Sequence, residues 1–479
     1  MNNFKDEWLG NIKGDLLAGL VVCMALIPEV IGFTIVAGVE PMIGIYTTFC
    51  FAIITSIFGG RTGMISAAAG SMAFVLAPLV REYGVQYMLI ATILTGIFQI
   101  ILGYLKVGKL LRFIPEPVMI GFVNALGILM FKAQIKHFEG SIILPILGII
   151  SITIIYLLPK LTKTIPSPII AIIVISIIVF IFNIDINTLG DMGEITTKLP
   201  KFSIPDAALN FQTLSIVLPY SISLAIVGLV ESLLTAGIVD DVTETNSNKN
   251  REAKGQGLAN VVTGFFGGIA GCGMIGQTVV NQEYGGRGRL SSLSAGLYIL
   301  FFIIVLNKIV IEIPIVAFAS VMVVVAITTF NWNSLRTITK VPITDTIVMI
   351  STVVIVLITN NLAYGVVLGI LLSSVFFVSK LSSLKINKLK FDDKEVYEVK
   401  GQLYFASVEA FRNKFDYNKN IKSIEIDLSN AQIWDQSAII AIDKVIERYK
   451  RYCINVGIKG VNDRGRELIK RMSKFKEII

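Results

Sequence analysis

Long apolar segments, separated by charged residues or by glycine and proline, fill most of this chain before residue 381. A helix needs about 20 apolar residues to cross the hydrocarbon core of a bilayer. Candidate segments lie near residues 14–37, 43–59, 64–80, 85–105, 111–131, 141–158, 167–183, 213–238, 253–269, 274–282, 290–310, 312–330, 343–358 and 362–380. The third and tenth are short and rich in Gly, Ala and Ser. The sequence therefore predicts an all-α polytopic membrane domain with fourteen transmembrane segments, seven in each half.

The composition supports a membrane protein and excludes several classes of enzyme. Charged residues make up only 16% of the chain, whereas ordinary globular domains contain about 25%. His137 is the only histidine, which excludes histidine-based metal sites and Ser-His-Asp catalysis. The four cysteines form no CxxC pair, so we expect free thiols. We predict that the protein is not an enzyme and has no cofactor, with a sodium ion as the single candidate.

The basic residues indicate membrane topology rather than a nucleic-acid partner. The net charge is +8, but the Lys and Arg residues are scattered over loops and form no single basic face. They are more frequent in loops on the side of the N-terminus, which places residues 1–13 and the C-terminal tail in the cytoplasm. We therefore expect a multi-pass protein of the cytoplasmic (inner) membrane that binds no nucleic acid. An odd number of spans in each half inverts the second half relative to the first.

Two glycine-rich stretches occupy corresponding places in the two halves. Residues 59–65 read GGRTGMI, and residues 267–275 read GGIAGCGMI. Each interrupts an apolar run and leads into a short stretch of small residues. Glycine-interrupted segments at matching positions of two repeats point to the binding site of a secondary transporter. We therefore expect two broken helices. The alternative is that these glycines only allow close helix packing.

The broken helices predict an anion site that contains no basic side chain. The half-helix after each break directs its free backbone amides and the positive end of its dipole toward the middle of the membrane. No Lys or Arg falls within these half-helices. The predicted anion-binding residues are Ala68, Ala69, Gly70 and Ser71 in the first half and Gly273, Met274 and Ile275 in the second.

Glu231 lies in the middle of the eighth apolar segment. An ionised residue at the centre of a membrane helix costs about 2.5–3.5 kcal/mol, so we expect this carboxylate to face a polar cavity. Thr235 follows one helical turn later on the same face, where its hydroxyl can share a ligand with the carboxylate. The pair is a candidate site for a coupling cation, either a sodium ion or a proton. The alternative is a neutral carboxyl group buried for packing.

Further polar residues lie within the apolar segments. Glu29 follows Pro28, which frees a backbone carbonyl in the first segment. It is either a second proton carrier or a group in a wet vestibule. Gln277 and Asn281 are candidates for lining the pore or for hydrogen bonding between helices, and Asn124 is assigned to helix–helix hydrogen bonding.

The tail at residues 391–479 has the composition of a small soluble domain, and residues 381–390 are expected to be a linker. Strands are predicted at residues 396–399, 402–406, 421–427 and 453–461. A helix is predicted after Asp435, where apolar residues recur at helical spacing. Strands that alternate with helices predict an α/β domain with a mixed sheet. The tail contains no glycine-rich phosphate loop, which argues against an ATPase.

Several motifs together resemble the sulfate permease (SulP) family over nearly the whole chain. They are ALIP at 25–28, PMIGIY at 41–46, IPEPVMIGFVNA at 114–125, ESLLT at 231–235 and GGRGRLS at 285–291, with the second glycine-rich stretch. In the tail, residues 427–438 resemble the loop of a STAS domain. The phosphorylatable Ser or Thr of anti-sigma-factor antagonists corresponds to Gln436, with Ser437 beside it.

The resemblance implies a fold, a site and a mechanism. The fold is a seven-plus-seven inverted repeat within residues 14–380. Spans 1–4 and 8–11 form a mobile core, spans 5–7 and 12–14 form a gate, and a cytoplasmic STAS domain follows. The implied mechanism is elevator-like alternating access in a homodimer. The resemblance places the anion near Ala69 and Met274, and in the sodium-coupled bicarbonate branch it places the cation by Glu231, Thr235, Gly273, Met274 and Ile275.

Four positions depart from the family pattern. The bicarbonate branch commonly has Asp where this chain has Glu231, and Thr where it has Ile275. The missing hydroxyl weakens a sodium site, and the longer carboxylate is equally consistent with proton coupling. Many animal relatives have Arg in place of Gln277, and many relatives have Gln in place of Glu29.

We therefore expect a secondary active transporter of a small inorganic anion, bicarbonate or sulfate, coupled to sodium or protons. A nucleobase or dicarboxylate proton symporter on the same fold is an alternative, although the glycine-rich stretches offer few polar side chains for base edges. A membrane scaffold or receptor that acts through its tail is a second alternative. The STAS domain is a candidate site for a cytoplasmic partner or a nucleotide.

Overall fold

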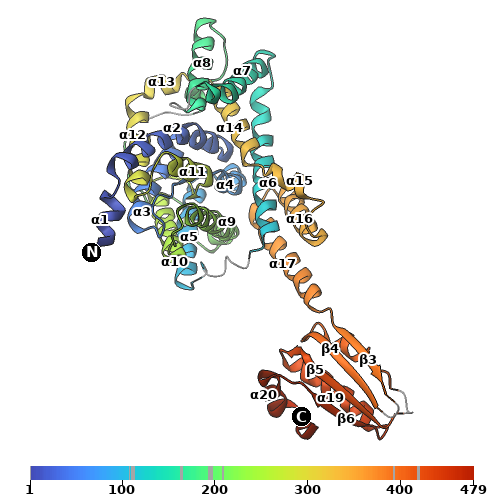
Figure 1. Ribbon diagram of the computed structural model, residues 1–479. Helices are drawn as coiled ribbons and strands as arrows, with labels where there is room; N and C mark the ends of the chain where they lie inside the picture. Colours follow the sequence, from blue (N-terminus) through green and yellow to red (C-terminus); the bar gives the residue numbers. More distant parts are fainter. Residues whose placement is uncertain are drawn as a thin grey trace. The chain divides into compact units, whose positions relative to one another are not determined.

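The computed structural model describes residues 2–106, 108, 114–161, 166–192, 198–207, 210–391, 394–417 and 421–478. Its contacts divide the chain into a membrane unit, Met1–Ile370, and a tail unit, Leu371–Ile479 (Figure 1). The division falls inside a helix, ahead of the boundary expected at residue 380.

Every apolar segment predicted in the first half corresponds to a helix. After the short helix α1 (Asn2–Leu9), these are α2 (Ile12–Ala37), α3 (Pro41–Phe58), α4 (Gly70–Tyr83), α5 (Val85–Tyr104), α6 (Glu116–Gln134), α7 (Ile143–Leu157) and α8 (Ser167–Ile181). The fifth segment was expected to start at residues 111–113, which lie outside the described residues.

The second half follows the same order. Its main helices are α9 (Phe211–Thr243), α10 (Lys249–Phe265), α11 (Ile275–Glu283), α12 (Arg289–Val305), α14 (Ile315–Thr329), α16 (Ile343–Thr359) and α17 (Leu362–Leu381). Two short helices, α13 (Asn307–Ile311) and α15 (Trp332–Thr337), lie between them. Among the described residues, 8 helical segments are long and apolar enough to cross a membrane, and α8, α12 and α16 are shorter apolar helices. This is the pattern of a multi-pass membrane protein.

Close helix packing in the membrane unit depends on small residues. Helix α5 packs against α10, α2 packs against α12, and α6 packs against α14 and α16. At the α5–α10 contact, a methyl group added at Gly96 would lie 2.4 Å from the carbonyl oxygen of Gly257. The two backbones approach so closely that neither position tolerates a side chain, as is typical of helix contacts in membranes.

The tail unit contains a four-stranded mixed sheet, as the sequence predicts. The strand order is β3-β4-β5-β6. Strand β3 (Lys385–Lys390) is antiparallel to β4 (Lys394–Leu403), whereas β5 (Ser423–Ile433) and β6 (Asn455–Lys459) continue the sheet in parallel.

Two expectations for the tail were wrong. The expected linker contains β3, so the sheet begins before residue 391. The strand predicted at 396–399 and the first two residues of the strand predicted at 402–406 lie in the single strand β4, which ends at Leu403 and whose pairing with β5 shifts between Glu398 and Lys400. This irregularity lets the strand continue through Gly401, which adopts a positive φ of 125°.

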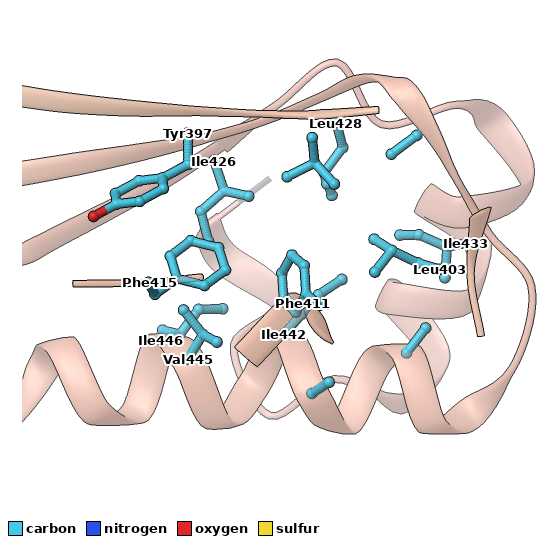
Figure 2. Close-up of a cluster of buried hydrophobic side chains, with 14 of the residues drawn as sticks. Tyr397, Leu403, Phe411, Phe415, Ile426, Leu428, Ile433, Ile442, Val445 and Ile446 are labelled. Carbon is cyan, nitrogen blue, oxygen red and sulfur yellow. The ribbon is translucent and has the colours of Figure 1, made fainter. Parts of the chain in front are cut away.

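The predicted helix after Asp435 is α19 (Gln436–Lys450). The Asp435 carboxylate caps it by accepting a hydrogen bond from the Ala438 amide at 3.0 Å. Figure 2 shows Ile442, Val445 and Ile446 of this helix facing the sheet, with two phenylalanine rings between the helix and the strands. Helices α18 (Val408–Arg412) and α20 (Asp463–Met472) complete the unit.

Candidate functional site

The membrane unit contains the two broken segments that the sequence predicts, and the structure shows that they meet. Strands β1 (Ser66–Ala68) and β2 (Gly271–Gly273) pair antiparallel, with Ser66 opposite Gly273. Helix α4 begins directly after Ala69, and α11 begins directly after Met274. Both preceding residues are extended, with φ values of −124° and −105°. The small sheet therefore holds the N-termini of two helices, and their free amides, next to each other.

A cavity of about 340 Å³ lies at these two helix starts. One wall consists of residues from the predicted core: Glu29, Phe33, Ala69, Gly70, Glu231, Met274, Ile275, Gly276 and Gln277. The opposite wall consists of residues from α6 and α14: Phe122, Val123, Leu126, Met130, Val325, Thr328 and Thr329. None of the described lining residues is Lys, Arg or His, so Glu29 and Glu231 are the only charged side chains in the wall.

Glu231 connects α9 to both broken segments. Its Oε2 atom accepts hydrogen bonds from the Ser71 hydroxyl group and, at 3.2 Å, from the Cys272 thiol. Ser71 belongs to the first turn of α4 and Cys272 to β2. The glutamate is 9% exposed and lines the cavity. The structure thus places the carboxylate where the sequence predicts it, at a polar cavity.

The role expected for Thr235, in which its hydroxyl shares a cation with the Glu231 carboxylate, stays a prediction. Its hydroxyl donates to the Glu231 backbone carbonyl at 2.8 Å, one turn back on the same helix, and lies 3.4 Å from the Gly273 carbonyl oxygen. It does not contact the carboxylate in the described structure and does not line the cavity.

Glu29 and Gln277 form a second polar pair at the cavity. The Gln277 side-chain amide donates a hydrogen bond to the Glu29 carboxylate, joining α2 to α11. Glu29 is 9% exposed, and both residues line the cavity. Glu29 is therefore a cavity group and lies with Glu231 in one site.

Some predicted site residues support the cavity without lining it. Within the small sheet, Ala68 pairs with Gly271 and Gly273 pairs with Ser66, and the Ser71 hydroxyl donates a hydrogen bond to Glu231. The expectation that Asn281 lines the pore was wrong. Its amide donates to the Gly63 carbonyl and to the Ser291 hydroxyl, both at 2.9 Å, which is the hydrogen-bonding role considered as the alternative.

Sequence reasoning missed the wall supplied by α6 and α14. These residues are apolar or hydroxyl-bearing, and nothing in the sequence distinguishes them from residues that face lipid. The role of Asn124 as a hydrogen-bonding group on α6 is confirmed, since it donates to the Ser334 hydroxyl at 2.9 Å and accepts from the Asn331 amide at 2.8 Å.

Sequence reasoning also missed a group of charged residues, here called the hinge cluster, that holds the loop between α3 and β1. Its members are Glu7, Arg61, Asp240, Lys249, Glu252 and Arg289. Glu252 accepts hydrogen bonds from the backbone amides of Gly60 and Arg61, at 2.6 and 3.0 Å.

The cations of the hinge cluster have fixed partners. The Arg61 guanidinium pairs with Asp240 at 3.1 Å, and Lys249 pairs with the same carboxylate at 2.8 Å. Arg289 pairs with Glu7 at 2.6 Å and donates to the carbonyls of Ser56 and Gly59, at 2.7 and 3.2 Å. The cluster therefore fixes the loop that leads to β1 and α4.

Comparison with known protein families places these features in context. The sequence profile of the Sulfate permease family matches residues 12–145 and 140–352, and that of the STAS domain matches residues 385–479. The STAS match begins at β3, in agreement with the sheet.

Individual relatives match over nearly their full length. The chain is 53% identical over 480 residues to the Bacillus subtilis protein named "Putative sulfate transporter YbaR", covering 99% of this chain and 100% of that one. It is 24% identical to "Bicarbonate transporter BicA" of Picosynechococcus sp., covering 98% of this chain and 92% of BicA. The fold resembles the murine Slc26a9 anion transporter in the inward-facing state, with a TM-score of 0.83 at 17% identity. That match covers 98% of this chain and 88% of the murine one.

Proposed function

Because this chain belongs to the sulfate permease family of anion transporters, we propose that it is a secondary active transporter of sulfate or bicarbonate across the cytoplasmic membrane. Sodium ions or protons are the coupling species. The observation that carries this proposal is the cavity where two helix N-termini meet the carboxylate of Glu231.

The cavity can hold an anion without a basic side chain. Helix N-termini carry partial positive charge and free amide donors. The starts of α4 and α11 present small residues, Ala69 and Gly70 in one and Gly276 in the other, so that a ligand can approach the backbone. The anion binds between these two helix starts, and Glu231 takes up the coupling cation beside it.

The hydrogen bonds of the site favour an elevator-like movement. Three hydrogen bonds join elements of the predicted core to each other. Ser71 of α4 donates to Glu231 of α9, Gln277 of α11 donates to Glu29 of α2, and the Gly273 amide of β2 donates to Ser232 of α9. None of these bonds reaches α6 or α14, whose cavity wall is mainly apolar. In this proposal the predicted core carries the site as one body past a gate whose described lining residues are apolar or hydroxyl-bearing.

The proposal extends to the assembly of the protein, its orientation in the membrane and the role of its STAS domain. The protein is a homodimer whose N-terminus and STAS domain lie in the cytoplasm. The STAS domain binds a cytoplasmic partner or a nucleotide and regulates transport.

Uptake by the purified full chain in liposomes tests the proposal. Labelled sulfate and labelled bicarbonate are supplied under a sodium gradient alone, a proton gradient alone, or neither. We expect accumulation of one of these anions against its concentration gradient when one of the cation gradients is present. Accumulation of neither anion under any gradient contradicts the proposal. Inhibition by uracil or succinate would instead indicate a nucleobase or dicarboxylate carrier.

A further inference from the structure

Two large aromatic side chains are exposed on the tail unit beside the end of α17. Phe405 is 63% exposed and Trp434 is 49% exposed. Together with Leu381 they line a pocket of about 390 Å³, here called the aromatic pocket. We propose that the aromatic pocket binds anionic phospholipids of the leaflet in which α17 ends, so that the STAS domain contacts the membrane surface. This inference goes beyond the proposed transport function and does not depend on which anion is carried.

The sheet topology brings the aromatic pocket to the end of the sheet that lies next to α17. Only residues 382–384 separate α17 from β3, so β3 begins beside the helix end and runs away from it. Strand β4 is antiparallel to β3 and returns to this end, where it stops two residues before Phe405. Strand β5 is parallel to β4 and stops directly before Trp434. Both aromatic residues therefore follow strands at the end of the sheet where the chain leaves α17.

A hydrogen bond fixes the aromatic pocket to the end of this helix. The Tyr404 hydroxyl donates to the Val378 carbonyl at 2.6 Å, and Leu381, the last residue of α17, lines the pocket. Residues 362–381 form one of the described helices that are long and apolar enough to cross a membrane. Val378 lies about 4.5 Å from the last residue along the helix axis. The pocket is therefore held at the depth of the lipid headgroups, where Tyr and Trp side chains are favoured.

The basic side chains at this end of the sheet suit anionic headgroups. The Arg464 guanidinium lies over the Trp434 ring, 5.2 Å from its centroid, and forms no ion pair among the described residues. A guanidinium stacked on a ring keeps its N–H donors available for a phosphate group. Lys385 and Lys400 lie opposite each other on β3 and β4, and the one acidic contact of Lys400 in the described structure is Glu398 at 4.0 Å. Like charges directly opposite each other destabilise a strand pair, and an anionic surface offsets this repulsion.

The polar groups that line the aromatic pocket are already bonded within the tail unit. The Asp435 carboxylate accepts from the amides of Ala438 and Phe405, at 3.0 and 2.8 Å, at the start of α19, where the helix dipole offsets its negative charge. The Trp434 indole donates to the Gln402 side chain. The pocket therefore offers a lipid mainly aromatic and aliphatic surface, with a cation at its edge.

A membrane is a better match for this surface than a soluble partner. Aromatic rings next to Lys and Arg are typical of segments that lie in the membrane interface. A soluble protein would have to reach a pocket that the Tyr404 bond holds beside the end of a membrane helix, whereas lipid is already present there.

The test is tryptophan fluorescence of the full chain in nanodiscs of phosphatidylglycerol and phosphatidylcholine, with bromine on the upper acyl-chain carbons as the quencher. The emission of Trp434 is the difference between the wild type and Trp434→Phe, and brominated lipid should remove most of it. Phe405→Trp in the wild-type background adds a second indole in the pocket, whose added emission should be quenched in the same way. Phe391→Trp is the matched control, because Phe391 is 60% exposed in the turn after β3, at the other end of the sheet. Its added emission should not be quenched.

A pair of charge variants tests the choice of anionic lipid. Arg464→Glu should weaken the quenching of Trp434 several-fold, whereas Lys470→Glu, the same kind of change at the other end of α20, should leave it at the wild-type level. Quenching that is unchanged in Arg464→Glu would overturn the assignment of anionic headgroups.

Two results would overturn the membrane contact itself. The first is emission from Trp434 and from the indole of Phe405→Trp that brominated lipid does not change. If dissolved acrylamide also fails to quench these indoles, the pocket is covered by protein, such as a second copy of this chain. The second is equal quenching of Phe391→Trp, which would show that the contact is not specific to the aromatic pocket.

Discussion

The cavity and the hinge cluster place buried acidic side chains in two different settings within the same membrane unit. In the hinge cluster, Asp240 and Glu7 are paired with arginine or lysine, and Glu252 accepts from two backbone amides and from the Gln256 side chain. In the cavity, Glu29 and Glu231 are held by an amide and a hydroxyl group that can also accept. The comparison teaches that buried acids of one membrane unit differ in whether a cation balances them: Asp240 and Glu7 have paired Lys or Arg side chains, whereas the described cavity lining has none.

The largest expected effect is the loss of transport activity in the variant Glu231→Gln. The amide can neither release a proton nor offer a charged ligand to sodium, so gradient-driven uptake should fall to the level of protein-free liposomes. The yield and the melting temperature of the protein should stay near those of the wild type, because the amide oxygen still accepts from Ser71. Coupled uptake at the wild-type rate would remove Glu231 from the mechanism. Glu116→Gln is the matched control.

The second largest effect is expected on the stability of the folded protein, when Arg289 of the hinge cluster is replaced in the variant Arg289→Ala. The change leaves the buried carbonyls of Ser56 and Gly59 and the partly exposed Glu7 without their partner, and an unsatisfied buried acceptor costs about 1–3 kcal/mol. We expect a large loss of monodisperse protein and of melting temperature in detergent. Arg336→Ala, at an exposed position, is the control. Equal stability of the two variants would show that the hinge cluster does not hold the loop.

A smaller effect is expected from Asp435→Ala in the tail unit. This carboxylate caps α19 and also accepts from the Phe405 amide at 2.8 Å. Loss of such a cap costs about 0.5–2 kcal/mol. Hydrogen exchange of the α19 amides in the full chain should become several-fold faster, whereas exchange in the membrane unit should not change. Faster exchange throughout the chain would contradict a local capping role.

The smallest effect is expected from Glu425→Gln on β5. Hydrogen bonds from Lys394 at 2.6 Å and Lys459 at 2.8 Å lower the pKa of the Glu425 carboxyl group. Because the folded pKa is below the unfolded one, the stabilisation is present above about pH 4.5 and is lost as the pH falls through the folded value. Exposed pairs contribute about 0.2–1 kcal/mol. The melting temperature of the variant should be slightly lower than that of the wild type at pH 7, and this difference in melting temperature should vanish at strongly acidic pH.

Much of the membrane unit could be predicted because the same pattern, a long run of apolar residues, recurs many times in the sequence. Most apolar runs are long enough to indicate a helix, and the glycines at 267–275 mark a place where a helix cannot continue. The bounds of the strands in the tail unit were harder to predict. The sequence around Gly401 resembles a turn, but pairing with β5 on one side and β3 on the other keeps the strand continuous.

The contacts that sequence reasoning missed within the site join residues that lie far apart in the chain. Asn281 lies near the Gly63 carbonyl, which a sequence separation of 218 residues conceals. The pairing of Gln277 with Glu29 joins residues 248 positions apart and was equally invisible.

The sequence by itself determined that this chain enters a membrane, that two of its helices are broken, and that at least one carboxylate must lie among them. These are local properties, set by hydrophobic length, by glycine and by the cost of burying charge. Only the tertiary structure decided that both breaks meet in one small sheet and that Glu29 and Glu231 share one cavity. The tertiary structure also decided that Glu29 is hydrogen-bonded to Gln277 and Glu231 to Ser71, whose side chains can accept as well as donate. Such features depend on contacts between distant segments, which composition and spacing do not encode.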